Sequence, residues 1–265
     1  MTLKGFDEMK NLSIYSSLGK GTTEERLKAI KNAGFNTVCL DFEKNVAHIE
    51  GDWVSQISHA VRAGLLIENV HLTGEGMSDI WADCINGNAV TDRLIAEMRD
   101  LKGLGLDKGV CHVTWGLAKP HEPDETGLDR FKRIADAAER YGVYLALENS
   151  VFPEYLQFIF DNIKSEYIGF CFDSGHEHAF AKDFGYLDKF GDRLMALHLH
   201  DNDGIHDQHL VPFYGSIDWD AKVKQLKKTK LWETTVTLES CIYGEESLED
   251  GLKRSYEAAK KLAEM

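Results

Sequence analysis

The chain has 265 residues, of which 43% are hydrophobic and 28% charged, and its formal net charge at pH 7 is −14. This length suits one eight-unit α/β barrel, and the composition excludes a disordered or low-complexity chain. The acidic balance disfavours polyanionic partners such as nucleic acids and anionic membrane surfaces, and no dense Lys/Arg run appears before the scattered KQLKKTK segment.

The five cysteines form no CxxC pair, and three of them (Cys39, Cys111 and Cys171) lie in apolar runs. Cysteine behaves there as a small hydrophobe, which indicates reduced, structural thiols. The N-terminal stretch MTLKGFDEMKNLSIYSS lacks the apolar core of a signal peptide, and no run approaches the roughly 20 apolar residues of a membrane span. We therefore expect a cytoplasmic protein.

An amphipathic helix followed by a short apolar strand recurs along the chain. In residues 22–42, TTEERLKAIKNAGFNTVCLDF, Thr22 or Thr23 can cap the helix and Gly34 can end it. The same order returns in residues 127–148, GLDRFKRIADAAERYGVYLALE. Strands that are apolar throughout are typical of a parallel sheet covered by helices.

Eight such strands are predicted. In chain order they lie near NLSIY (11–15), NTVCLDF (36–42), ENVHLT (68–73), KGVCHVTW (108–115), VYLALE (143–148), IGFCFD (168–173), LMALHLHD (194–201) and TTVTLE (234–239). Eight β-then-α units without a linker-like segment predict an α/β fold, a single (β/α)8 TIM barrel over residues 1–265. The sequence argues against a nucleotide-binding fold, because the chain has neither a GxGxxG after the first strand nor a GxxxxGK[ST] motif.

The fifth to eighth strands each end on a residue that can bind a metal. These residues are Glu148, Asp173, His198 and Glu239. Parallel strands point the same way in a barrel, so we expect the four ends to converge at one rim. For any one of them alone, a helix cap or a pair with lysine is the simpler interpretation. Together, three carboxylates and an imidazole carry a repulsion and desolvation cost that a divalent ion would relieve.

Further histidines fall at the same predicted rim. They are His71, His112, His176, His178, His200, His206 and His209. A lone strand histidine is more often a hydrogen-bonded core residue, but this number at one end indicates a polar pocket. Trp115, three residues after His112, can give a sugar ring an apolar wall, although ordinary packing explains it equally well.

At residues 173–178 (DSGHEH) and 198–219 (HLHDNDGIHDQHLVPFYGSIDW) the chain resembles the sugar phosphate isomerase/epimerase family. These xylose isomerase-like TIM barrels include ketose 3-epimerases, inosose dehydratases and AP endonucleases of the endonuclease IV type. The resemblance covers nearly the whole chain. Its most specific elements are ALEN, DSGH, HLHD, DQH and TLE, each weak alone and strong in combination.

The resemblance implies one divalent ion, such as manganese, magnesium, cobalt or zinc. Its implied ligands are Glu148, Asp173, His198 and Glu239, and its implied substrate contacts are His71, His112, His176 and His209. His71 and His112 match positions that hold additional zinc in the nuclease branch, for which Asp207 is a further candidate ligand.

Two positions near the seventh strand leave open questions. His200 competes with His198 for the ligand position, because both point to one face of the strand. His198 is preferred, since the family's ligand is usually followed three residues later by an acid, here Asp201. Phe213 departs from the family, in which glycine commonly follows the proline, and this puts the shape of the loop in question.

These residues predict a divalent-metal-dependent isomerase or epimerase that acts on a keto-sugar or sugar phosphate. A metal-stabilised enediolate would form, with Glu148 and Glu239 transferring the proton. The alternatives are an inosose-type dehydratase, an endonuclease IV-like hydrolase and a non-catalytic sugar-binding barrel. An unphosphorylated ketose is favoured, because no Lys/Arg cluster marks a phosphate site. We expect a small carbohydrate as partner, with no nucleic acid or membrane; a homo-oligomer stays open.

Overall fold

The computed structural model describes residues 10–42 and 52–265, so most of the N-terminal stretch considered for a signal peptide lies outside it. Eight parallel strands form one sheet in the order β7-β6-β5-β4-β3-β2-β1-β8. The strands are β1 (Asn11–Tyr15), β2 (Thr37–Asp41), β3 (Leu66–His71), β4 (Lys108–His112), β5 (Tyr144–Glu148), β6 (Ile168–Asp173), β7 (Leu194–His198) and β8 (Thr235–Leu238). A parallel bridge between Leu199 and Leu238 joins the two ends of the sheet. The predicted (β/α)8 TIM barrel is confirmed.

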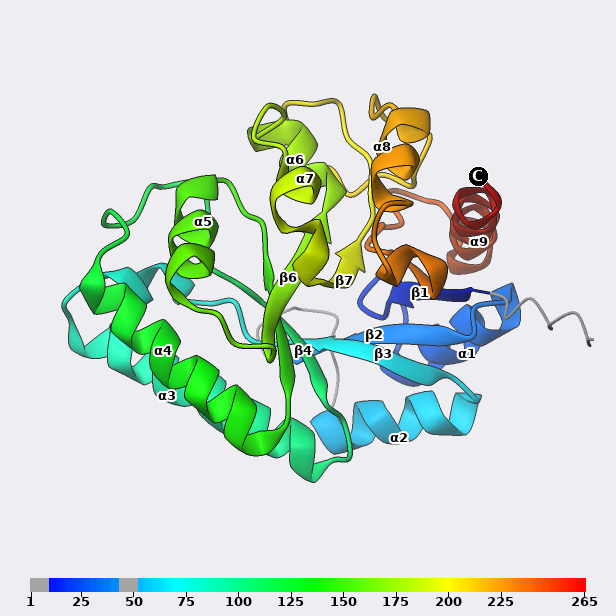
Figure 1. The fold of residues 1–265 in the computed structure, drawn as a ribbon. Helices are drawn as coiled ribbons and strands as arrows, with labels where there is room; N and C mark the ends of the chain where they lie inside the picture. Colours follow the sequence, from blue (N-terminus) through cyan, green and yellow to red (C-terminus); the bar gives the residue numbers. More distant parts are fainter. Residues whose placement is uncertain (1–9, 43–51) are drawn as a thin grey trace, which may run out of the picture.

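Helices surround the strands on the outside (Figure 1). They are α1 (Thr23–Ala33), α2 (Trp53–Ala63), α3 (Ile85–Gly103), α4 (Glu125–Tyr141), α5 (Pro153–Asn162), α6 (Ser174–Phe180), α7 (Tyr186–Phe190), α8 (Trp219–Leu226) and α9 (Leu248–Glu264), with short 3-10 turns η1 (Met77–Trp81), η2 (Gly191–Arg193) and η3 (Leu231–Glu233). None of the helices in the described ranges has the length and apolar character needed to cross a membrane.

The helix ends follow from local sequence. Thr22, not Thr23, is the N-cap of α1: its hydroxyl accepts the Glu25 N–H, and the Glu25 carboxylate accepts the Thr22 N–H. This reciprocal capping box satisfies two backbone donors that a helix leaves open. At the other end, Gly34 has a φ of 115°, a left-handed conformation that ends the helix without a Cβ clash.

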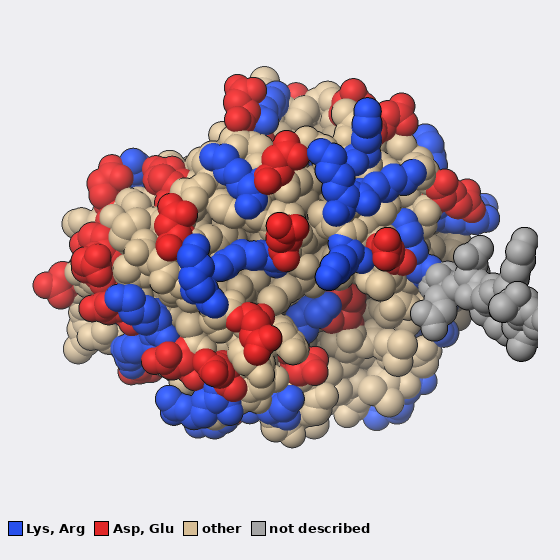
Figure 2. All heavy atoms as spheres, viewed as in Figure 1, with Lys and Arg blue, Asp and Glu red and all other residues tan. Residues whose placement is uncertain are grey.

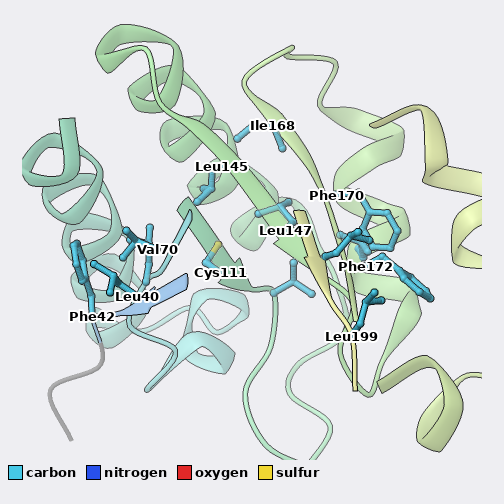
Figure 3. Close-up of a cluster of buried hydrophobic side chains, with 14 of the residues drawn as sticks. Leu40, Phe42, Val70, Cys111, Leu145, Leu147, Ile168, Phe170, Phe172 and Leu199 are labelled. Carbon is cyan, nitrogen blue, oxygen red and sulfur yellow. The ribbon is translucent and has the colours of Figure 1, made fainter. Parts of the chain in front are cut away.

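The hydrophobic core lies between the strands and the helices (Figure 3). Strand side chains such as Leu40, Val70, Leu145 and Phe170 point outward into it, and all four are fully buried. Inside the barrel a second, small cluster is made of Val110, Ala146, Cys171 and Ala196. Each of these four stands two residues before a residue at the strand end, so the cluster forms part of the layer directly beneath the rim.

Asp201 organises the long connection between β7 and α8. Its carboxylate is fully buried and accepts hydrogen bonds from the backbone N–H groups of Phe213 and Ile217 and from the indole N–H of Trp219, at 2.8 to 3.0 Å. Phe213 takes the left-handed backbone conformation, with a φ of 76°. The loop therefore keeps a backbone shape that suits glycine, even though this chain has phenylalanine there.

The Gly34→Ala substitution should destabilise the protein. An added Cβ would lie 2.7 Å from the ring of Tyr256 on α9, and the positive φ is itself unfavourable for alanine. We expect a loss of about 1–3 kcal/mol, measured by urea unfolding. Gly103→Ala is the matched control, because a Cβ there meets nothing within 4 Å. Equal unfolding midpoints for the two variants would contradict this account.

Candidate metal centre

The four strand-end residues come together at the rim. Glu148, Asp173 and His198 are the last residues of β5, β6 and β7, and Glu239 directly follows β8. A ligand atom from each of the four lies within 4.8 Å of the others. His198 Nδ1 is 3.1 Å from an oxygen of Glu148 and 3.1 Å from an oxygen of Glu239. This group is buried, and only Glu239 is partly exposed.

Several polar atoms in this group are buried without a hydrogen bond. They are both carboxylate oxygens of Glu148, both ring nitrogens of His198 and one carboxylate oxygen of Glu239. Buried polar atoms in proteins are normally hydrogen-bonded, and buried charges are normally paired or bound to a metal. Oxygen and imidazole donors suit a divalent ion such as zinc, manganese or cobalt, so the residues present fit a metal.

A second donor group surrounds Asp207. The Nε2 atoms of His176 and His209 lie 3.2 and 3.3 Å from Asp207 Oδ2, and the Nε2 atom of His200 lies 3.7 Å from Oδ1. The ligand atoms of these four residues are within 4.8 Å of one another. His176 and His209, predicted from the sequence as substrate contacts, thus fall in one group with the lesser candidates Asp207 and His200.

A third donor group shares Glu148 with the first. His71 Nε2 is 3.4 Å from one Glu148 oxygen, and His112 Nε2 is 3.5 Å from the other. The three ligand atoms again lie within 4.8 Å of one another. Glu148 is therefore the residue at which two donor groups meet.

The structure separates His198 from its rival His200. His198 faces Glu148 and Glu239, whereas His200 Nε2 lies 3.1 Å from Asp173 Oδ2 and its ring stacks on His209 at 4.0 Å between centroids. The four-residue group thus contains His198, and His200 belongs to the group around Asp207. Their side chains diverge beyond the regular strand, because β7 ends at His198 and only an isolated bridge from Leu199 to Leu238 follows.

Backbone carbonyls fix the orientation of three of the histidines. The Nδ1–H groups of His71, His176 and His209 donate to the carbonyls of Leu72, Asn149 and Glu239, at 2.8 to 2.9 Å. A carbonyl only accepts, so in a neutral ring the lone pair is on Nε2, which in each case faces a carboxylate. Metal-ligating histidines in proteins are oriented in this way by their second nitrogen.

Without a cation, the imidazoles neutralise the carboxylates. Burial opposes the charge on His209, but Asp207 and Glu239 raise the pKa of His209 to about 10. Burial also opposes the charge on Asp207, yet hydrogen bonds from His176 and His209 hold the pKa of Asp207 well below its usual range. The pKa of Glu148 is likewise held low, against burial, by His198 and His112.

A cavity of about 370 Å³ opens over the three groups. This volume lies within the roughly 300–1,000 Å³ that small-molecule sites occupy. Its lining residues are His112, Thr114, Trp115, Gly116, Leu117, Glu148, Ser150, Val151, His176, Phe180, Asp207, His209 and Glu239. One wall is apolar, and none of these lining residues is a lysine or arginine. Trp115 is half-exposed, with its ring 5.3 Å from that of His112.

Sequence reasoning missed residues on the opposite side of the rim. Tyr15 and Asp41 end β1 and β2 and are buried. The Tyr15 ring meets the rings of His198 and His71 edge-on, at 5.7 and 6.1 Å. Asn149 was also missed: its side chain makes two 2.8 Å hydrogen bonds to the backbone of Asp173. The strand-end rule used for β5 to β8 finds Tyr15 and Asp41 when it is applied to every strand.

The pattern of the xylose isomerase-like TIM barrel family matches residues 27–262, which is most of the chain. The chain belongs to this family. Solved structures of similar fold include a D-tagatose 3-epimerase-like protein (18% identity, TM-score 0.75, 96% of this chain and 97% of the other). The IOLI protein with a bound zinc atom is similar too (16% identity, TM-score 0.73, 96% and 98%). At these identities the likeness shows the fold alone.

Relatives in sequence are uncharacterized proteins. One from Sinorhizobium fredii is 44% identical over 72 residues, which are 27% of this chain and 23% of the relative. One from Methanocaldococcus jannaschii is 33% identical over 135 residues, 49% of this chain and 51% of the relative. The matches therefore span about half or less of these relatives' own lengths.

The stability of the metal-free protein should depend on pH on both sides of neutrality. The pKa of His209 is raised, so its stabilising contribution is present at low pH and is lost as the pH rises towards 10. The pKa of Asp207 is lowered, so its contribution is lost as the pH falls below the ordinary carboxyl range. We expect the melting temperature of chelator-treated protein to fall in both directions.

His209→Gln should flatten the alkaline decline in melting temperature. His206→Gln is the control, because His206 is exposed and pairs with Asp203 away from the three groups. An alkaline decline that is the same in His209→Gln and in the unsubstituted protein would overturn the assignment.

Proposed function

We propose that this protein is a divalent-metal-dependent isomerase or epimerase of an unphosphorylated keto-sugar. One observation carries the proposal: an oxygen of Glu148 and an oxygen of Glu239 each lie 3.1 Å from His198 Nδ1, in one buried donor group. The fold similarity to a D-tagatose 3-epimerase-like protein and to an L-ribulose 3-epimerase (18% identity, TM-score 0.75) supports it by analogy.

Glu148, Asp173, His198 and Glu239 would hold the ion. When bound, a divalent ion supplies Lewis-acid polarisation of the substrate carbonyl, which makes the neighbouring C–H more acidic. In this proposal Asp173 and His198 serve as ligands only, whereas the two glutamates also exchange a proton with the substrate. Asn149 keeps Asp173 in place through its pair of hydrogen bonds to the Asp173 backbone.

The proton transfer needs two carboxylates that are ionised at neutral pH. The pKa of Glu148 and that of Glu239 both lie below the ordinary range, because neighbouring imidazoles outweigh the effect of burial. One glutamate removes the proton from the carbon beside the carbonyl, and the other returns a proton to the opposite face. The stereocentre is thereby inverted.

The lining of the cavity favours an uncharged polyol. His112, His176 and His209 contribute imidazoles to the lining, and Trp115 and Leu117 contribute apolar side chains. Imidazoles can exchange hydrogen bonds with sugar hydroxyls, and an aromatic face can cover the C–H face of a ring. The absence of lysine and arginine among these lining residues argues against a phosphate group on the substrate.

Glu148→Gln and Glu239→Gln should each lower turnover by about 10²–10⁴-fold, the range for loss of a general acid or base. The measurement is proton NMR in deuterated water with manganese or magnesium and a panel of keto-sugars, following exchange beside the carbonyl. Metal content is determined in parallel. Full turnover in either variant with the ion still bound would disprove the two-carboxylate mechanism.

Glu68→Gln is the matched control for these two variants. Glu68 is also a largely buried glutamate, but it pairs with Lys108 at 2.7 Å on β3 and β4, away from the strand ends. Its substitution should leave exchange unchanged. This comparison separates the loss of a proton carrier from the loss of any buried carboxylate.

A second candidate, a metal-dependent phosphodiester hydrolase, is favoured by a different observation. The first and third donor groups share Glu148, and His176 of the second lies 3.2 Å from the same carboxylate, so together the three groups can hold more than one ion. Clusters of ions clamp the attacking and leaving oxygens in phosphoryl chemistry. The net charge of −14 argues against duplex DNA as the substrate, because the phosphates are also negatively charged. On the face shown in Figure 2, basic and acidic residues are interspersed.

Metal stoichiometry separates the two candidates. The hydrolase predicts two or three zinc ions per chain after loading and desalting, loss of one ion in Asp207→Asn, and cleavage of a phosphodiester such as bis(p-nitrophenyl) phosphate. The epimerase predicts one tightly held ion that survives Asp207→Asn and no cleavage. Mass spectrometry of the metal content and a colorimetric assay provide both measurements.

A further inference from the structure

One buried thiol lies directly beneath the four-residue group. Cys171 is on β6, two residues before Asp173, and is fully buried. Its sulfur, an oxygen of Glu148 and a ring nitrogen of His198 all lie within 4.8 Å of one another. Neither the family resemblance nor the proposed mechanism gives this thiol a role.

His198 differs from the other histidines at the rim in how it is oriented. His71, His176 and His209 donate from Nδ1 to a backbone carbonyl and present Nε2 to a carboxylate. His198 presents Nδ1 to the carboxylates instead, and neither of its nitrogens makes a hydrogen bond. Its Nε2 needs a partner if the ring is to hold this orientation.

The thiol of Cys171 lies within reach of His198. Cys171 belongs to the small cluster beneath the rim with Val110, Ala146 and Ala196, and it is the only one of these four with a polar side-chain atom. The rings of Tyr15 and His71 flank His198, with centroids at 5.7 and 5.8 Å. Sulfur is a weak hydrogen-bond acceptor. Because neither ring nitrogen of His198 has a hydrogen-bond partner, a small rotation of the ring can bring Nε2–H to the sulfur.

We propose that Cys171 is a positioning residue for His198: its sulfur accepts a hydrogen bond from Nε2–H and so leaves the Nδ1 lone pair facing Glu148 and Glu239. The thiol thereby sets the tautomer and ring angle of the only imidazole in the four-residue group. This inference rests on the proposed metal site, although it does not depend on which substrate the enzyme converts.

The test is the affinity of the full chain for Co²⁺ and Zn²⁺, measured by competition with a chromophoric chelator. Cys171→Ala should weaken binding by about 10–100-fold, the usual effect of removing an outer partner of a metal ligand. Cys171→Ser should recover most of the affinity, because a hydroxyl also accepts a hydrogen bond. A residue that only fills space predicts the opposite order, since a buried serine is less favourable than alanine.

Cys111→Ala is the matched control. Cys111 is a fully buried strand cysteine too, but it belongs to the outer core between strands and helices (Figure 3). Its removal should leave metal affinity unchanged. The melting temperature of each metal-free variant shows whether the barrel is still folded, and Cys171→Ser provides a second test if Cys171→Ala is too unstable.

Two results would overturn the inference. Equal metal affinity in Cys171→Ala and the unsubstituted chain would show that the thiol does not position His198. A sulfur-to-cobalt charge-transfer band in the near ultraviolet, lost in Cys171→Ser, would show that Cys171 binds the ion itself. If the unsubstituted chain binds neither ion, the proposed metal site fails as well, so the two failures are distinguishable.

Discussion

The organisation of this protein depends on the cost of burying several carboxylates and imidazoles at one end of a barrel. The four-residue group combines three carboxylates with one imidazole and contains no lysine or arginine; its members are Glu148, Asp173, His198 and Glu239. Five of their buried polar atoms make no hydrogen bond. In the metal-free state, imidazolium groups partly offset the carboxylate charge, which is why the pKa values of His198 and Glu148 move in opposite directions. A divalent cation would remove the same cost without requiring protonated histidines.

The barrel supplies rigidity for this arrangement in layers. Helices and strands enclose a continuous apolar core, and a thin layer of small side chains fills the barrel beneath the rim. The backbone then orients individual groups: carbonyls hold three histidine rings, and Asn149 holds the Asp173 backbone. Such supporting contacts keep the donors aligned before an ion or substrate is bound, so less free energy is lost on binding.

The cavity and the donor groups point to different aspects of function. A lining that combines Trp115 and Leu117 with imidazoles and carboxylates favours a small polyol over an anionic substrate. The three adjoining donor groups, in contrast, have the capacity for more than one ion. Both features are compatible with the xylose isomerase-like fold, because chemistry in a TIM barrel is decided by strand ends and loops while the fold stays the same.

The sequence by itself determined the eight strands, the barrel and the four strand-end residues, because apolar strand patterns and helix caps are local signals. Only the tertiary structure decided between His198 and His200, which are two residues apart and share a face in an ideal strand; the strand ends between them. The orientation of each imidazole, the grouping of His200 with Asp207 and the place of Cys171 beneath the rim also required the fold, since they depend on contacts between residues distant in sequence.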